Sequence, residues 1–397
     1  MKEMKVSILG FGMMGVVRAV AYEAVPRYYT NSPIKPVLNE AFCLEAEAAA
    51  ASASGWKANT DMMAVINNPE TEYVDICLPN DLHCKTAIAA FEAGKHVFCE
   101  KPLSSILDEG RAMAEAADAH PNQLNALNFI YRRCPANVYA RKLVQSGKFG
   151  RLLEADMTYL QSWGGPSTPG SWRFDQPGGG ALGDLGSHAF DMLYYVTGKR
   201  PVEIAALKAT HVKQRKFKKT AGSDFADRYG NGAKAEDFEM KDITVDDAMN
   251  IIFTLPECDP ANPVDCIGTL RTSRNCFGTE NTHAYTLYFE NGAIRWNYDD
   301  VNWIEVYDAT LPFEQRGWAR VCANRSGFAY PSFADGHMFG YRDFTVNACY
   351  ENMLKIAGLP EVAPIATFRD GFNVQRTLEA CKKAHAEKRW VALDEIQ

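Results

Sequence analysis

A glycine-rich turn near the N-terminus constrains the fold of this chain more than any other feature. It follows the strand-like run Val6–Leu9 and precedes a helix-like run that reaches about Glu23. In such a turn the first glycine permits the tight bend, the second lets the backbone approach a pyrophosphate, and the third lets the helix pack against the strand. We therefore predict a dinucleotide site whose phosphate loop is Gly10, Phe11, Gly12, Met13, Met14 and Gly15.

Strand-like and helix-like runs alternate after the glycine turn. The buried-strand pattern Tyr73–Leu78 precedes the helix-like run Lys85–Ala93, and the strand-like His96–Cys99 precedes the helix-like Ile106–Ala119. This βαβαβ order predicts an α/β fold with a doubly wound parallel sheet of the Rossmann type. At 397 residues the chain is long for a single core, so two domains are expected, the first being an NAD-binding domain over residues 1–134.

A lysine stands at the carboxyl end of a predicted strand, in the run Glu100-Lys101-Pro102. The proline disfavours a helical conformation for Lys101, so the chain must turn there. Ligands of an open parallel sheet bind at the carboxyl ends of its strands, so we expect the Lys101 ammonium to lie in a ligand site. Asn80 ends the preceding strand and could hold the nicotinamide ribose, or it could be a plain turn or capping residue.

The second strand of a dinucleotide-binding domain should end in an acidic residue that hydrogen-bonds the adenosine ribose. In the run Ile34–Glu40 the obvious candidate is Glu40, and Asn39 is the fallback. A carboxylate there would repel the 2′-phosphate of NADP, and no arginine lies beside it. The sequence therefore favours NAD over NADP, although the insertion Val25–Pro33 makes the spacing from the glycine turn to Glu40 longer than usual.

Composition excludes several other classes of protein. The net charge of −7 gives no general attraction to nucleic acid or to an anionic membrane, and no apolar run is long enough to span a bilayer. The N-terminal residues run straight into a strand-like segment rather than a signal peptide, so we expect a cytoplasmic protein. The 11 cysteines, an odd number without a Cys-x-x-Cys pair, predict reduced thiols rather than a disulfide framework or a metal site.

Four motifs together identify a family. They are Gly10–Gly15, Pro79–His83, Glu100–Pro102 and Gly178–Asp191, and in this order and spacing they resemble the Gfo/Idh/MocA oxidoreductases. The resemblance covers nearly the whole chain. It implies Lys101, Asp184 and His188 as the catalytic set, and cofactor contacts from Pro79, Asn80, His83, Glu100 and Lys101.

Three further runs narrow the resemblance. Tyr159–Trp163, Ser171–Phe174 and Thr272–Asn275 are most similar to the levoglucosan dehydrogenase subgroup. Members of that subgroup oxidise the 3-hydroxyl of a glucose unit. The resemblance therefore implies an NAD-dependent dehydrogenase that acts on a secondary hydroxyl, at C3, of a sugar, anhydrosugar or glycoside.

The resemblance also implies an α+β second domain over residues 135–397, with a large, mostly antiparallel sheet that binds substrate and joins subunits. Two helices, Tyr341–Ala357 and Asp370–Ala386, should close the chain, and the last is expected to pack back on the first domain. An exposed face of the sheet suggests a homodimer or homotetramer. The strand-like runs are Arg151–Gln161, Ala248–Leu255, Asp265–Thr272, His283–Phe289, Gly292–Trp296 and Trp303–Tyr307.

Oxidation of an alcohol needs a hydride acceptor, a base for the hydroxyl proton and a group that stabilises the developing alkoxide. His188 suits the base, because the ordinary pKa of histidine lies near neutral pH. Lys101 suits the alkoxide, because a fixed ammonium in a dry cleft favours negative oxygen. Asp184 lies four residues before His188 and could orient the imidazole or join a hydrogen-bond network with the substrate. The alternative in which Lys101 takes the proton stays open.

Aromatic and bidentate polar side chains near the proposed site suggest a sugar. Flat sugar faces stack on aromatic rings, and hydroxyls need paired donors and acceptors. Trp163 could instead belong to the core, and Trp172 and Arg173 could contact the cofactor. The candidate substrate residues are Lys101, Tyr131, Arg132, Trp163, Asp184, His188, Asn275 and His337.

Five basic residues fall within the seven positions from Lys213 to Lys219. Because the chain is acidic overall, a solvated loop is predicted ahead of a subunit contact or an anionic-substrate site, and a nucleic-acid arm is least favoured. Two rival functions stay open: a glycosidase that oxidises its substrate transiently with bound NAD, and a non-catalytic dinucleotide-binding regulator. A regulator would not need Lys101, Asp184 and His188 together.

Overall fold

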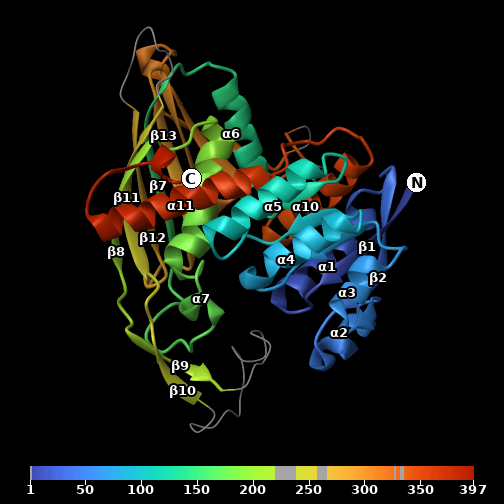
Figure 1. The fold of residues 1–397 in the computed structure, drawn as a ribbon. Coiled ribbons are helices and arrows are strands. Elements are labelled where there is room, and N and C mark those ends of the chain that lie inside the picture. The colour runs from blue at the N-terminus through green and yellow to red at the C-terminus, as the bar shows by residue number, and fades with distance from the viewer. Residues whose placement is uncertain (1, 220–237, 257–265, 326–327, 331–334) are drawn as a thin grey trace. The chain divides into compact units, whose positions relative to one another are not determined.

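The computed structural model describes residues 2–219, 238–256, 266–325, 328–330 and 335–397 (Figure 1). The chain divides into two compact units. Unit 1 comprises Met1–Arg133, Phe217–Glu239 and Gly340–Phe372, and unit 2 comprises Cys134–Lys216, Met240–Phe339 and Asn373–Gln397. The domain bounds 1–134 and 135–397 stay predictions.

Unit 1 is built on a six-stranded sheet in the order β3-β2-β1-β4-β5-β6, and its neighbouring strands are parallel. All four residues of β4 are buried, as expected for a parallel sheet covered on both faces. This arrangement confirms the predicted doubly wound α/β fold. The strands are β1 (Lys2–Leu9), β2 (Ile34–Phe42), β3 (Lys57–Asn59), β4 (Tyr73–Ile76), β5 (His96–Cys99) and β6 (Asn125–Leu127).

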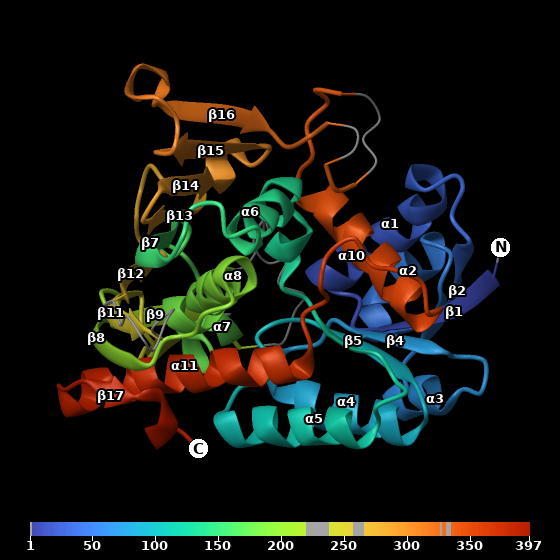
Figure 2. The ribbon, with the colours of Figure 1, turned by 90° about the horizontal axis from the view of Figure 1, so that it is seen from above.

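Helices cover both faces of this sheet, with α1 and α10 on one side and α4 and α5 on the other (Figure 2). The late helix α10 packs on α1 through Tyr29, whose ring stacks 3.7 Å from that of Tyr350 and whose hydroxyl donates to Asn347. The helical elements of unit 1 are α1 (Met13–Tyr28), η1 (Glu45–Glu47), α2 (Ala48–Ala53), α3 (Met62–Asn67), α4 (Asn80–Glu92), α5 (Leu107–Ala119), η2 (Ile130–Arg133) and α10 (Tyr341–Ile356).

Unit 2 is built on a nine-stranded sheet in the order β16-β15-β14-β13-β7-β12-β11-β8-β17. Only the β7–β12 pair among these neighbours is parallel, so the predicted large, mostly antiparallel sheet is confirmed. The strands are β7 (Leu152–Gln161), β8 (Glu203–Ala209), β11 (Ala248–Leu255), β12 (Cys266–Ser273), β13 (Asn281–Phe289), β14 (Gly292–Asn297), β15 (Trp303–Asp308), β16 (Trp318–Cys322) and β17 (Val391–Ala392).

Helices α6 and α8 lie against one face of the nine-stranded sheet (Figure 2). Along β11, residues alternate between buried and more exposed positions, which is typical of a sheet with one covered face. The final helix α11 (Phe368–Glu387) begins in unit 1 and continues in unit 2. The other elements are α6 (Pro135–Gln145), α7 (Trp172–Asp175), η3 (Leu182–Gly186), α8 (Ser187–Thr197), η5 (Tyr298–Asp300), η6 (Phe313–Gln315) and η7 (Leu393–Glu395).

The basic run forms a strand rather than a solvated loop. Strand β9 (Gln214–Lys218) pairs with β10 (Phe238–Asp242) in a separate two-stranded sheet. Exposed residues alternate along β9 with buried Arg215 and Phe217. The polar stretch that follows the run lies mostly outside the described residues, at 220–237.

The ten cysteines in the described part of the chain are all free. None of the helices among the described residues has the length and apolar character needed to cross a membrane.

Candidate active site

The glycine turn has the geometry that its sequence predicts. Gly10 has a φ of +99°, a region that favours glycine, and a Cβ added at Gly15 would lie 2.0 Å from the carbonyl oxygen of Gly10. By contrast, a Cβ added at Gly12 would meet nothing nearer than the Glu47 Oε1 atom at 3.9 Å. The turn is therefore closed on the sheet side and open at Gly12, where α1 begins.

Both carboxylate oxygens of Glu40 accept hydrogen bonds from side chains of unit 1. Glu40 lies two residues before the end of β2, is buried, and its Oε1 accepts a 2.6 Å hydrogen bond from Lys57 Nζ while its Oε2 accepts a 2.9 Å bond from Asn68. Burial alone would raise the pKa of Glu40, but these hydrogen bonds hold it below its usual value. The fallback, Asn39, donates to Thr71. A ribose contact from Glu40 or Asn39 stays a prediction.

Glu47 is the acidic residue that lies beside the turn. Its Oε2 accepts the backbone N–H of Leu44 at 3.2 Å, which fixes the side chain at the start of η1. Its Oε1 is the atom that lies nearest to the open side of Gly12. Sequence reasoning did not single out Glu47, because β2 continues through Phe42, beyond Glu40, so the chain leaves the sheet later than expected.

Glu100 is an internal residue that holds Lys101. Its Oε1 accepts hydrogen bonds from Arg18 Nη2 at 2.8 Å and from Asn128 Nδ2 at 2.7 Å. Its Oε2 accepts the backbone N–H of Lys101 at 3.3 Å. Lys101 itself is half-buried directly after β5, and its peptide bond to Pro102 is cis. Because both carboxylate oxygens of Glu100 are used inside the protein, this residue fixes the lysine segment.

A buried arginine balances the charges beneath the lysine. The Arg18 guanidinium lies 3.8 Å from the centre of the Phe98 ring, and its Nε is 3.6 Å from Asp75 Oδ2. Tyr22 donates to the same Asp75 oxygen at 2.9 Å. Burial raises the pKa of Asp75 to about 6, although Arg18 opposes that shift. A buried carboxylate is tolerated when it is paired and hydrogen-bonded, as here.

Asn80 and His83 differ in what they can offer a ligand. Both are buried in α4, but the Asn80 Nδ2 atom has no hydrogen-bond partner among the described residues. The His83 Nε2 lies 2.9 Å from the Leu78 carbonyl oxygen and its Nδ1 3.1 Å from that of Pro102. Burial lowers the pKa of His83. His83 thus ties together the segments that follow β4 and β5, whereas Asn80 keeps a donor for a ligand.

In unit 2, Asp184 and His188 lie on one continuous helical segment. Asp184 belongs to the π-helical turn η3 and His188 to α8, which follows at once. A Cβ added at Gly183 would fall 2.2 Å from the Gly178 carbonyl oxygen, so the turn needs a glycine there. His188 is buried, with its ring 6.0 Å from that of Tyr159. π-Helical turns are frequent at functional sites because they redirect side chains.

Arg274 is the direct partner of Asp184. Its Nη2 donates to Asp184 Oδ2 at 3.1 Å, and its Nη1 donates to the Arg173 carbonyl oxygen at 3.0 Å. The guanidinium carbon lies 5.0 Å from the centre of the Trp163 ring. The sequence alone assigned Arg274 no role, because it stands 90 positions after Asp184 and nothing local shows their contact.

The other candidate side chains of unit 2 lie in different surroundings. Trp163 and Trp172 are half-buried, and the Arg173 guanidinium carbon lies 4.4 Å from the centre of the Trp172 ring. The side chain of Asn275 lies against the carbonyl oxygens of Gly164 and Arg274. His337 is exposed. In unit 1, Tyr131 and Arg132 are buried in η2, and Arg132 pairs with Asp370 at 3.4 Å.

Comparison with known proteins places both units in one family. Residues 4–127 match the model described as the oxidoreductase family, NAD-binding Rossmann fold, and residues 138–295 match the GFO/IDH/MocA C-terminal domain. The chain belongs to the Gfo/Idh/MocA oxidoreductases. A levoglucosan dehydrogenase from Pseudarthrobacter phenanthrenivorans is 32% identical over 410 residues, covering 100% of both chains. A D-glucoside 3-dehydrogenase from Escherichia coli is 31% identical over 147 residues, or 37% of this chain and 41% of its own.

Solved structures of two oxidoreductases share this fold over the whole chain. An oxidoreductase domain protein from Kribbella flavida superposes with a TM-score of 0.87 at 32% identity, covering 99% of this chain and 100% of its own. Levoglucosan dehydrogenase in complex with NADH and levoglucosan gives a TM-score of 0.84 at 28% identity, with the same coverage.

The residues present in this Gfo/Idh/MocA chain fit an NAD cofactor. The open side of Gly12 would admit a pyrophosphate, and the N-terminus of the 16-residue helix α1 supplies N–H donors. The unpartnered Nδ2 of Asn80 supplies a further donor at the end of β4. The chain therefore has an NAD-binding domain with a prepared phosphate turn.

The basic run contributes a structural arginine to unit 2. The Nη1 of Arg215 donates to the Gly165 carbonyl oxygen at 2.8 Å and its Nη2 to that of Gly164 at 2.6 Å. Its Nη2 also pairs with Asp247 at 3.3 Å. Arg215 is buried and holds the segment that follows Trp163. The prediction of a solvated loop was wrong for this residue. The prediction counted the basic residues of the run and did not consider that buried and exposed positions alternate along a strand.

Proposed function

We propose that this protein is an NAD-dependent dehydrogenase that oxidises a secondary hydroxyl, at C3, of a sugar, anhydrosugar or glycoside. The observation that carries the proposal is the full-length similarity to levoglucosan dehydrogenase. Lys101 after β5, and Asp184 and His188 on η3 and α8, support it by supplying the groups that alcohol oxidation requires.

Each residue of the catalytic set has a separate role in the proposed reaction. Bound NAD supplies the hydride acceptor. His188 accepts the hydroxyl proton and Lys101 stabilises the alkoxide, whereas Asp184, held by Arg274, orients the polar groups around them. Exchange of the Lys101 and His188 roles is the alternative assignment.

The cofactor assignment adds Glu47 to the predicted Glu40. We propose that Glu47 accepts hydrogen bonds from the adenosine ribose, because its Oε1 flanks the open side of Gly12. Its negative charge would repel a 2′-phosphate, which favours NAD over NADP. Met13 and Met14 lie at the start of α1, and Pro79 precedes α4, so they belong to the same cofactor region of unit 1.

The test is a panel of levoglucosan, alkyl glucosides and free sugars, each mixed with NAD and the protein and followed by absorbance of NADH. Sustained NADH formation from at least one of them is expected. Cleavage of a glycoside without net NADH would instead assign the transient-oxidation glycosidase. Binding of NAD without reaction on any member would favour the regulator.

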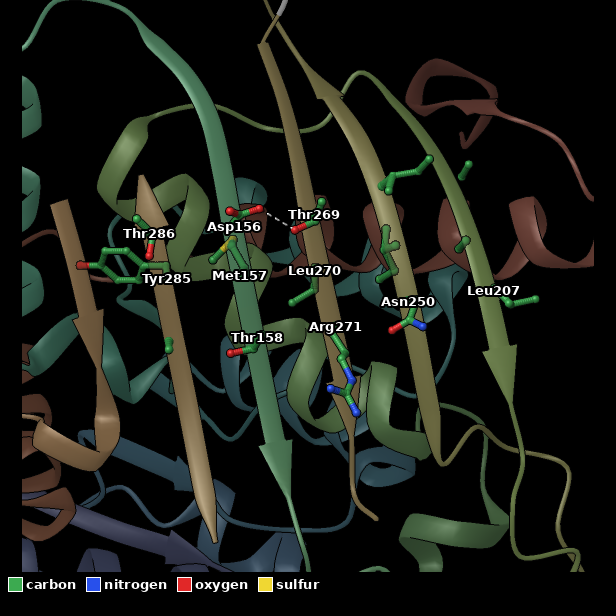
Figure 3. A pocket seen from close by; sticks show the side chains of 15 residues that line it. Asp156, Met157, Thr158, Leu207, Asn250, Thr269, Leu270, Arg271, Tyr285 and Thr286 are labelled. Atoms are coloured by element: carbon green, nitrogen blue, oxygen red, sulfur yellow. Dashed lines mark hydrogen bonds between the residues drawn. The ribbon is translucent and has the colours of Figure 1, made fainter. Parts of the chain in front are cut away.

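We also propose that the protein assembles as a homodimer or homotetramer through the outer face of the nine-stranded sheet. A hollow of about 760 Å³ lies on β13, β7, β12, β11 and β8 (Figure 3). Its rim includes the exposed apolar side chains Leu207 and Ile252. Exposed Asp156 and Arg271 lie on the neighbouring strands β7 and β12. A two-fold axis between them would bring Asp156 of one copy opposite Arg271 of the other, and the reverse.

Replacement of Ile252 by Asp tests this assembly. Size-exclusion chromatography with light scattering should give the wild type a mass at least twice the 44.1 kDa of one chain. Ile252→Asp should shift the mass toward one chain, because a charge would be buried unpaired. Leu311→Asp, at an exposed leucine outside the hollow, is the matched control. A monomeric wild type, or an unchanged mass for Ile252→Asp, would refute this interface.

A cytoplasmic location completes the proposal. The ten free cysteines of the described residues support it, because reduced thiols persist in a reducing compartment.

A further inference from the structure

Arg274 is a buried cation at which four segments of unit 2 meet. It follows β12 and is 0% exposed. Its guanidinium donates to the Asp184 carboxylate in η3 and to the Arg173 carbonyl oxygen in α7. Burial lowers the pKa of Arg274, while the Asp184 and Asp246 carboxylates oppose that shift. An arginine side chain stays charged in proteins, so a fixed positive charge faces Asp184.

The position of this charge is determined by the backbone as well as by packing. The Arg274 N–H donates to the Asp247 carbonyl oxygen at 3.0 Å, and its carbonyl oxygen accepts from the Gly164 N–H at 2.9 Å. A Cβ added at Gly164 would lie 2.6 Å from the Arg274 Cβ, so the two segments are in close contact. The guanidinium carbon lies beside the contacting Trp163 and Phe174 rings, 5.0 and 5.4 Å from their centres.

The contact with Arg274 favours one protonation state of the Asp184 carboxyl group. A nearby guanidinium favours the ionised form of a carboxyl group, and a charge-assisted hydrogen bond fixes its direction. One oxygen, Oδ2, is bound to Arg274. An ionised carboxylate is only an acceptor, so Asp184 can orient donors around it but cannot give up a proton.

We propose that Arg274 is a positioning residue of the reaction and that it acts through Asp184. The inference rests on the proposed dehydrogenase function. It makes Asp184 an ionised orienting group and leaves proton transfer to His188 or Lys101. It also links the orientation of Asp184 to the segments that carry Trp163 and Arg173, since one guanidinium contacts all three.

A double-mutant cycle tests this inference. We expect Arg274→Gln to lower kcat on the order of 100-fold, because a small displacement of a reacting group has an effect of that size. The Kd for NAD should change much less than kcat, because Arg274 lies outside unit 1, which contains the phosphate turn. Arg274→Gln combined with Asp184→Asn should be no slower than Asp184→Asn alone. Arg274→Lys should restore part of kcat, because it keeps the charge.

Arg215→Gln is the matched control. Arg215 is equally buried and its guanidinium carbon lies 3.9 Å from the centre of the same Phe174 ring, but its carboxylate partner is Asp247. Arg215→Gln and Asp184→Asn should act independently, so the fold-reduction of kcat in the double variant should equal the product of the two single reductions. Circular dichroism and Tm confirm folding of each variant, and if Arg274→Gln does not fold, the cycle is run with Arg274→Lys.

The outcomes separate the inference from the function on which it rests. The inference alone would be overturned, in an active wild type, by either of two results. One is that the Arg274 and Asp184 variants reduce kcat independently. The other is that Arg215 is coupled to Asp184 as strongly as Arg274 is. A wild type that forms no NADH with any sugar would overturn the proposed function and the inference with it.

Discussion

Lys101→Ala is expected to lower kcat by about 10²–10³-fold, since removal of one preorganised group that stabilises a developing negative oxygen has an effect of that size. The lysine segment is fixed from both sides, by the Glu100 carboxylate on the Lys101 N–H and by His83 on the Pro102 carbonyl. These contacts fix the backbone from which the Lys101 side chain extends, and a solvent water that took the place of the ammonium would have to reorganise during the reaction. The loss should therefore appear in kcat, with the Kd for NAD changed much less.

Steady-state NADH formation on the best sugar of the panel measures this effect, with NAD affinity followed by protein fluorescence. His188→Ala, tested separately, should also reduce kcat, by about 10²–10⁴-fold for loss of a general base. Lys85→Ala is the matched control, because Lys85 is an exposed lysine on α4. If both Lys101→Ala and His188→Ala stay within about threefold of wild type, the catalytic assignment is wrong.

Gly15→Ala is expected to weaken NAD binding by about tenfold to a hundredfold, without a change in the catalytic groups. The new methyl group would lie 2.0 Å from the Gly10 carbonyl oxygen, far inside contact distance. Gly10 cannot withdraw, because it already packs against the Cys77 carbonyl, 2.7 Å from where its own Cβ would be. Overpacking of this kind costs about 1–3 kcal/mol, and relief by moving the turn would displace the N–H groups that face the pyrophosphate.

Isothermal titration of NAD into the variant and the wild type measures this change. Gly317→Ala is the control, because a Cβ there would meet nothing within 4 Å among the described residues. It should leave both NAD affinity and Tm close to wild type. An unchanged Kd for Gly15→Ala would show that the turn does not bind the dinucleotide.

Local patterns in the sequence were enough to predict the strands and turns that carry most of the site residues. The glycine turn fixed the first strand and helix, because its φ and contact requirements are met by glycine alone. The Lys101-Pro102 pair placed the lysine at the end of β5, and the runs of alternating residues gave most strands of the large sheet. The predicted strand Asp265–Thr272 is β12, with Asp265 itself outside the described residues.

Long-range pairing decided what the sequence could not. Glu40 and Glu47 are both glutamates of the segment that follows α1, and the sequence alone does not show that β2 continues through Phe42 or that Glu47 lies beside Gly12. Arg18 looks like an ordinary helix residue until Asp75 and Glu100, on two other strand ends, are brought to it. Arg215 and Arg274 likewise acquire their roles from carbonyl groups and carboxylates distant in the chain.

We propose that hydride passes from C3 of a sugar to NAD on this protein. The most direct measurement uses a glucoside or levoglucosan deuterated at C3, with mass spectrometry of the reduced cofactor and of the sugar product. We expect one deuterium in each reduced nicotinamide and a 3-keto sugar in equal amount. Reduced cofactor without deuterium, or cleavage of the glycosidic bond with no reduced cofactor, would contradict this proposal.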